Sequence, residues 1–187
     1  MVSEGILSQI LANGFSGLLA NLAASYIDRK SRRIKSSVDV IKRDLEDHLS
    51  MSFRKCMNVK TILSDAASKT LEIYVDQTFR VGSKDIDQYE MVESIRSGDS
   101  VLIIGEGGGG KSMFMRYLWL SYFEKSDGKI PFFLELRNLN SLTHRNISDF
   151  VYHSIMRTGS SIKQLEFIDA LRDGEFILFL DGFDEIN

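Results

Sequence analysis

The chain has very little cysteine and histidine, and each scarcity excludes a class of protein. The single cysteine, Cys56, rules out an internal disulfide framework and suits a reducing compartment such as the cytoplasm. The three histidines, His48, His144 and His153, are scattered without metal-ligand spacing, which argues against a zinc site. The formal net charge is only −3, so direct binding to nucleic acid is not expected.

The N-terminal segment lacks charge altogether between Gly5 and Ile27, and a basic cluster at Arg29–Arg33 follows it. No basic segment precedes this apolar stretch, so a cleaved signal peptide is not expected. The stretch has a wide apolar arc and a narrow uncharged polar strip on a helical wheel. Three interpretations stay open for residues 5–27: a helix packed on residues 34–63 or another subunit, an effector segment that meets a membrane after assembly, and a constitutive membrane anchor.

The next part of the chain shows two kinds of periodicity. Apolar residues recur at helical spacing from Ile34 to Leu63, which predicts a helix with Cys56 in the core. Thr70–Phe79 is rich in β-branched and aromatic residues and predicts a strand. Val81–Asp85 is predicted as a loop and Ile86–Arg96 as a short helix. We expect this whole region to pack on the following domain and to shape the rear wall of a nucleotide site.

Residues 105–112 read Gly-Glu-Gly-Gly-Gly-Gly-Lys-Ser and fit G-x-x-x-x-G-K-[ST], a loop whose N–H groups bind nucleotide phosphates. The apolar run Val101–Ile104 precedes the loop and suits a buried parallel strand, and a predicted helix follows Ser112. Lys111 is expected on the β- and γ-phosphates, and the Ser112 hydroxyl on Mg²⁺. The predicted nucleotide-binding residues are Gly105, Glu106, Gly107, Gly108, Gly109, Gly110, Lys111, Ser112 and Met113.

A second motif follows the apolar run Phe176–Leu180, which leads directly into Asp-Gly-Phe-Asp-Glu at residues 181–185. A carboxylate at the carboxyl end of a buried strand is where a P-loop enzyme holds its Mg²⁺. We therefore predict Asp181 as a metal ligand together with Ser112. Asp184 and Glu185 are predicted catalytic residues beside Lys111, with Glu185 orienting or deprotonating the attacking water. The two motifs together predict an α/β P-loop NTPase with a parallel sheet and an α-helical segment before it.

The strand followed by Asp-Gly-Phe-Asp-Glu resembles the signature of the NACHT family, signalling NTPases of the STAND class. Lys129–Leu139 is similar to the family's second strand, and Ala170–Phe176 to the helix and turn before the acidic strand. The resemblance covers about residues 45–187. It implies a switch that binds and hydrolyses Mg²⁺-ATP, self-associates on activation and acts in antiviral defence. ATP is expected because it is the common nucleotide of the family.

The resemblance also implies a fourth strand between the phosphate-loop strand and the acidic strand, and that strand is expected after Asn187. The chain is therefore interpreted as a truncated fragment with uncertain activity, or else as one half of a split gene. The alternative function is an AAA-type remodelling ATPase without a signalling role. The predicted organisation is an amphipathic helix with a basic cluster at 1–33, a helical lead-in with one strand at 34–96, and the NTPase core at 97–187.

Overall fold

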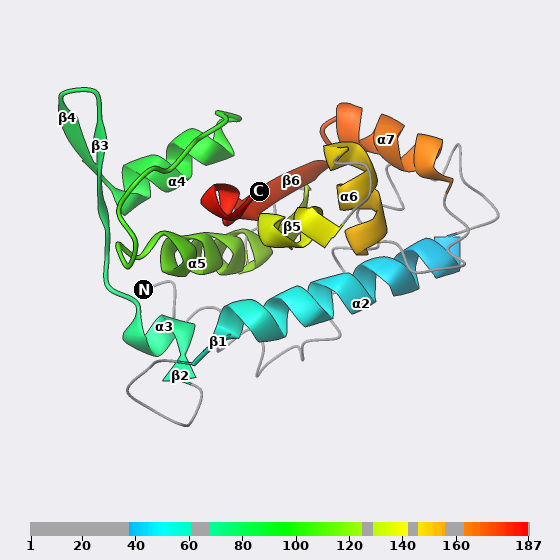
Figure 1. Cartoon of the computed structure of the whole chain (residues 1–187), viewed down its shortest axis with the longest axis horizontal. Helices are drawn as coiled ribbons and strands as arrows, with labels where there is room; N and C mark the ends of the chain where they lie inside the picture. Colours follow the sequence, from blue (N-terminus) through cyan, green and yellow to red (C-terminus); the bar gives the residue numbers. More distant parts are fainter. Residues whose placement is uncertain (1–37, 61–67, 125–128, 142–145, 156–162, 187) are drawn as a thin grey trace.

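The computed structural model describes residues 38–60, 68–124, 129–141, 146–155 and 163–186 (Figure 1). The predicted amphipathic helix at residues 1–33 lies outside this part of the chain, so its three interpretations stay open, as do the domain boundaries. Within the described residues, no helix is both long and apolar enough to cross a membrane. The α/β fold class predicted from the sequence is confirmed.

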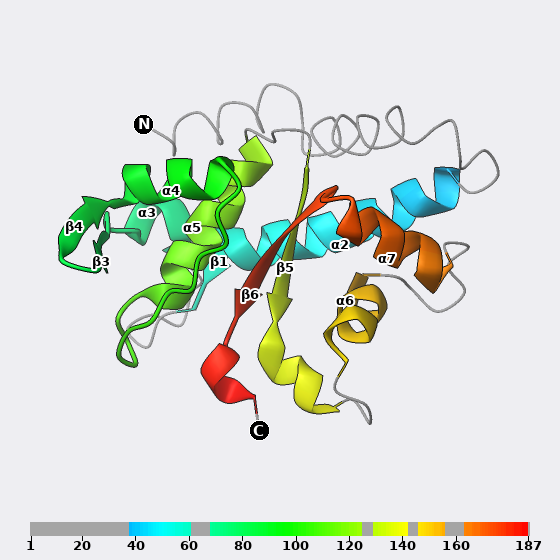
Figure 2. The same ribbon diagram turned by 90° about the horizontal axis from the view of Figure 1, so that it is seen from above.

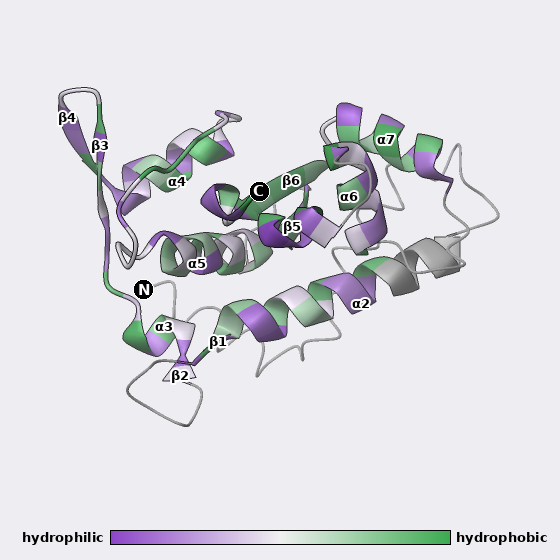
Figure 3. Ribbon diagram, viewed as in Figure 1, coloured by the Kyte–Doolittle hydropathy of each residue, from purple (hydrophilic) through white to green (hydrophobic). Residues whose placement is uncertain are grey.

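A two-stranded parallel sheet lies at the centre, formed by β5 (Ile130–Glu135) and β6 (Phe176–Asp181). Its register pairs Ile130 with Phe176 and Glu135 with Asp181, so the carboxyl ends of both strands meet at one edge. Both strands consist mainly of apolar residues, which Figure 3 shows for β6. Such continuous apolar runs suit parallel strands that are covered on both faces. The sequence therefore predicted both strands correctly.

Two long helices cover this sheet (Figure 2). Helix α5 (Lys111–Glu124) contacts both strands, and α2 (Val38–Met57) packs on α5 and β5. Between the strands, the chain forms the 3-10 helix η1 (Leu136–Ser141) and then α6 (Ile147–Ile155) and α7 (Gln164–Arg172), which pack on each other.

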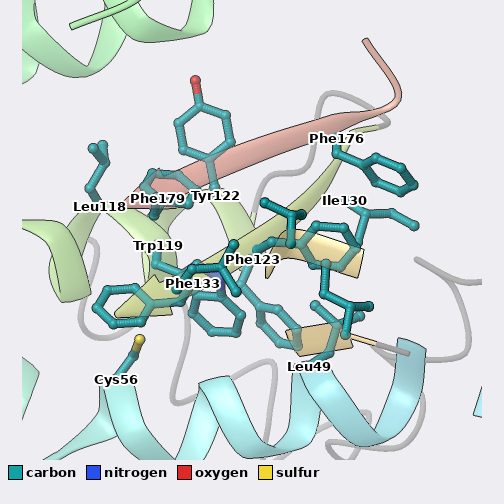
Figure 4. Packing of buried hydrophobic residues seen from close by; sticks show 14 of the residues in the cluster. Leu49, Cys56, Leu118, Trp119, Tyr122, Phe123, Ile130, Phe133, Phe176 and Phe179 are labelled. Atoms are coloured by element: carbon teal, nitrogen blue, oxygen red, sulfur yellow. The ribbon is translucent and has the colours of Figure 1, made fainter. Parts of the chain in front are cut away.

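The buried core joins these elements through large apolar side chains (Figure 4). Trp119 and Leu49 are fully buried, and the Trp119 indole nitrogen donates to the Pro131 carbonyl at 3.2 Å. Cys56 is also fully buried and free, which confirms its predicted place in the core. Burial raises the pKa of the Cys56 thiol well above its ordinary value, so this thiol is inert toward reagents that need a thiolate.

The lead-in differs from the predicted arrangement of one long helix and one strand. Helix α2 ends at Met57, and β1 (Asn58–Val59) pairs antiparallel with β2 (Ser68–Lys69). The predicted strand at Thr70–Phe79 is correct only for its last two residues, because α3 occupies Thr70–Ile73 and residues 74–77 belong to no helix or strand. Thr70 is fully buried and its hydroxyl donates to the Cys56 carbonyl, so a tertiary contact overrides the β-propensity of this segment.

A β-hairpin stands where a loop was predicted. Strand β3 (Thr78–Val81) pairs antiparallel with β4 (Lys84–Asp87), and helix α4 (Gln88–Arg96) follows at once. The Asp87 side chain accepts from the Glu90 N–H at 2.8 Å and caps this helix. The hairpin projects from the body of the molecule beside α4 (Figure 1).

The prediction for Val101–Ile104 is also wrong. The run was predicted as a buried parallel strand, but it pairs with no other strand in the described part of the chain. Leu102 is 70% exposed and Ile104 is 85% exposed. The run is apolar enough to be buried, but burial of a strand also needs a neighbour to pair with its backbone groups. The described sheet supplies only β5 and β6, and β6 lies across a cavity from this run.

Candidate nucleotide-binding site

The phosphate loop lies between the exposed run at 101–104 and the first turn of α5. Gly108 and Gly110 have φ angles of 80° and 82°, a region that other residues rarely adopt. The Gly109 N–H donates to the Glu106 carbonyl at 3.1 Å, and the Phe114 N–H donates to the Gly110 carbonyl at 2.9 Å. The glycines therefore fold the loop into a tight turn that leads directly into the helix. Glycines with positive φ next to a helix N-terminus form the kind of turn that can present backbone N–H groups to an anion.

Lys111 reaches back along the loop. Its ammonium donates to the Gly105 carbonyl at 2.6 Å and to the Glu106 carbonyl at 3.0 Å. A positive charge is thereby held between the start of the loop and the N-terminus of α5, and the helix end adds its own positive potential there. The arrangement places a cation beside the N-terminus of a helix, which favours an anionic group such as a polyphosphate.

Ser112 and Asp181 are brought together from positions 69 residues apart in the sequence. The Ser112 hydroxyl donates to the Asp181 carboxylate at 2.9 Å. Ser112 stands in the first turn of α5, and Asp181 is the last residue of β6. The two predicted metal ligands therefore share one place at the carboxyl edge of the sheet.

The oxygen chemistry of this pair fits Mg²⁺. Mg²⁺ is typically bound by one or two carboxylates, several waters and substrate phosphates rather than by a cage of protein ligands. The described residues contain no group of three or more His, Cys, Asp or Glu able to hold a metal ion. One hydroxyl and one carboxylate next to a phosphate loop are the ligands that such a metal requires.

Glu185 folds back over the turn that follows β6. Gly182 has a φ of 80°, and a Cβ atom there would lie 3.3 Å from the Glu185 carboxylate. The short 3-10 helix η2 (Phe183–Glu185) is tied to η1 because the Asn140 amide donates to the Glu185 carbonyl at 2.8 Å. The Gly in Asp-Gly-Phe-Asp-Glu thus permits the turn, and Asn140 fixes it.

Two cavities flank Lys111. One, of about 620 Å³, lies between residues 99–103 and β6, and Ser112, Asp181 and Glu185 are among its lining residues. Asp184 lines the same cavity. The other, of about 820 Å³, lies between hairpin β3–β4 and the loop residues Gly109–Lys111. Lys111 therefore has a cavity rich in carboxylates on one side and a cavity lined by the hairpin on the other.

All the predicted site residues are described, and the structure brings them to one end of the sheet. Glu106 is exposed in the loop, and Met113 is partly buried in α5. The sequence did not predict a role for Asn140, whose amide donates to the Glu185 carbonyl in the acidic turn. It also did not predict one for Gln77, whose amide oxygen lies near Gly110 of the phosphate loop. Neither lies in a motif, and only the tertiary fold reveals their position.

Comparison with curated proteins and with solved structures gave no match. Residues 99–187 match the family model of the NACHT domain. The match spans the phosphate loop, α5, both strands of the parallel sheet and the acidic turn. It agrees with the resemblance inferred from Asp-Gly-Phe-Asp-Glu. Residues 99–187 of this chain are therefore similar to the NACHT domain, a nucleotide-binding module of the P-loop NTPase superfamily.

Proposed function

We propose that this chain binds ATP with Mg²⁺ at the phosphate loop and hydrolyses it as part of a signalling switch. The observation that carries the proposal is the 2.9 Å hydrogen bond between Ser112 and Asp181, which joins the two halves of the site. In P-loop NTPases, a loop Ser or Thr and an acid at the end of a neighbouring strand hold Mg²⁺ together.

Each side chain has a defined task in this proposal. Lys111 and the loop N–H groups bind the β- and γ-phosphates, and Ser112 and Asp181 hold Mg²⁺. The metal neutralises charge on the phosphate oxygens when it is bound. Glu185, whose main-chain carbonyl accepts from the Asn140 amide, orients the attacking water with its carboxylate and accepts its proton. Asp184 lines the same cavity and adds negative charge on the water side.

The hairpin cavity takes the nucleoside in this arrangement. The carboxylates of Asp181, Asp184 and Glu185 repel further anionic groups, so they suit the metal and water end of a nucleotide. The opposite cavity has the partly buried side chains of Phe79 and Ile86 in its wall and opens on Gly110. Apolar and aromatic side chains with a few polar groups are typical of sites for small organic ligands. The lead-in thus forms the rear wall of the site.

The test is calorimetric titration of Mg²⁺-ATP into the chain and its Lys111→Ala variant. We expect the wild type to bind and the variant to lose detectable binding, because the loop then lacks its only side-chain cation. Lys129→Ala is the matched control, because Lys129 is an exposed lysine that directly precedes β5. Tight binding by Lys111→Ala contradicts the site assignment.

The cellular role is proposed from the family resemblance rather than from the geometry. The nucleotide is expected to control self-association in a defence response, and residues 5–27 are expected to contact another subunit or a membrane. A remodelling ATPase is the second candidate. The motif favours the switch, because remodelling ATPases usually place the catalytic glutamate directly after the metal aspartate, whereas Gly182 and Phe183 intervene here before the acidic pair.

A further inference from the structure

The side chain of Gln88 is a buried polar group at the base of hairpin β3–β4. It is only 1% exposed. Its carbonyl oxygen accepts from the Tyr74 hydroxyl at 2.6 Å and from the Gln77 N–H at 3.3 Å, and its NH₂ group donates to the Asp76 carboxylate at 2.6 Å. The three partners precede β3, whereas Gln88 follows β4. One amide therefore ties together the two ends of the hairpin.

This tie is also anchored to the helix that carries the phosphate loop. The Tyr74 ring stacks on the Tyr117 ring of α5, with centroids 4.2 Å apart and planes 6° from parallel. Burial raises the pKa of the Tyr74 phenol, and the neighbouring Tyr117, Asp76 and Tyr89 raise it further, so the hydroxyl stays a donor to Gln88. A buried amide is costly unless its hydrogen bonds are made, so the network favours one arrangement of the hairpin base.

Gln77 connects this network to the phosphate loop. Its NH₂ group donates to the Val75 carbonyl at 2.7 Å, which turns the amide oxygen toward the loop. That oxygen lies 3.5 Å from the place of a Cβ atom on Gly110. Beyond it, the Phe79 ring rests on the Phe114 ring of α5 at 4.5 Å. Gln77, Phe79 and Gly110 all line the cavity of about 820 Å³ assigned to the nucleoside.

We propose that Gln88 is a positioning residue for nucleoside binding, which holds the hairpin wall and Gln77 in place against the phosphate loop. The inference rests on the proposed nucleotide binding and deepens it. None of the hydrogen bonds described above joins Gln88 to the phosphate loop or to the predicted metal ligands. Its loss is therefore expected to weaken contacts with the nucleoside while it leaves the binding of phosphates unchanged.

The most informative variant is Gln88→Glu. It keeps an oxygen that accepts from Tyr74 and Gln77, but it replaces the donor to Asp76 by a second carboxylate oxygen, which repels Asp76. Asp76→Asn combined with Gln88→Glu exchanges donor and acceptor across the same pair, so the hydrogen bond is restored. The double variant is thus a rescue specific to this pair, and comparison of ATP with tripolyphosphate separates a positioning role from a general loss of stability. Thermal unfolding midpoints of each variant accompany the binding measurements.

The experiment titrates Mg²⁺-ATP and, separately, Mg²⁺-tripolyphosphate into the whole chain and both variants. We expect Gln88→Glu to lower ATP affinity about tenfold, the loss expected for one charge-assisted hydrogen bond, with tripolyphosphate affinity unchanged. The double variant is expected to regain most of the ATP affinity.

Unchanged ATP affinity in Gln88→Glu overturns the inference and leaves nucleotide binding intact. An equal loss for ATP and tripolyphosphate without rescue overturns it too, because Gln88 then has a merely structural role. A wild type that binds neither ligand overturns the proposed function, and the inference with it.

Discussion

At the scale of single residues, the phosphate loop depends on backbone angles that glycine alone adopts without strain. Gly110 has a φ of 82°, and a Cβ atom there also meets the Gln77 amide oxygen at 3.5 Å. We predict that Gly110→Ala weakens Mg²⁺-ATP binding about tenfold, since a left-handed conformation costs a residue with a Cβ roughly 1–2 kcal/mol. Gly107→Ala is the matched control, because an added Cβ at Gly107 meets no atom within 4 Å. Equal effects of the two changes in titration contradict this view of the loop.

His48 connects stability to pH. Burial lowers the pKa of its imidazole to about 4 from an ordinary 6.5, against a smaller upward effect of a backbone hydrogen bond at Ser154. The unfolded chain therefore binds the proton more readily. We predict that the free energy of unfolding is greatest above pH 6.5 and falls by up to about 3 kcal/mol as the pH drops toward 4.

Urea unfolding at several pH values tests this prediction with His48→Gln and, as control, the exposed His153→Gln. The fall between pH 6.5 and 4 is expected to be smaller in His48→Gln and unchanged in the control. Identical pH profiles of wild type and His48→Gln show that the partly buried imidazole is not responsible.

Some of the site residues could be predicted from the sequence, and others could not. Lys111, Ser112 and Asp181 could be selected from the sequence because motif spacing indicates the chemistry proposed for each, and the structure places Ser112 beside Asp181. Gln88 was not predictable, since nothing in the neighbouring sequence distinguishes a buried glutamine from an exposed one. Its role depends on Tyr74 and Asp76, which only the hairpin brings within hydrogen-bond distance.

At the scale of elements, the strongly apolar β5, β6 and α5 were predictable because burial on several sides leaves a long, uninterrupted pattern. The end of α2 was not, because apolar spacing continues past Met57 where the backbone changes direction. A tertiary contact accounts for this end. The Arg116 guanidinium, from α5, donates to the Lys55 and Asn58 carbonyls at 3.2 Å each. A cation that satisfies the last carbonyls of a helix stabilises its terminus.

We predict that Arg116→Met lowers the free energy of unfolding by about 1–2 kcal/mol, because two carbonyls lose a charged donor. Arg172→Met is the control, since its side chain is 76% exposed and its ion pair with Asp169 is long, at 3.8 Å. The control is expected to change stability by less than about 0.5 kcal/mol. Denaturant midpoints of the two variants provide the comparison, and similar losses contradict a special role for Arg116.

At the scale of the whole molecule, the sheet and the phosphate loop do not form one continuous layer. The apolar run Val101–Ile104 faces, across the cavity of about 620 Å³, the edge of β6 that pairs with no strand among the described residues. Hydrophobicity predicted a buried strand, but the burial of a strand also needs a neighbouring strand, and none among the described residues pairs with this run. Unpaired strand edges with apolar side chains are surfaces that readily accept another strand.

This separation leads to a stability prediction for the two sides of the cavity. Leu102 is 70% exposed and Phe179 is 3% exposed. We predict that Leu102→Ala changes the free energy of unfolding by less than about 0.5 kcal/mol, whereas Phe179→Ala lowers it by about 3–5 kcal/mol through cavity formation. Urea unfolding at low protein concentration measures both. A Leu102→Ala loss of several kcal/mol contradicts the exposed position of the run, because only a leucine packed against a partner strand has that much apolar contact to lose.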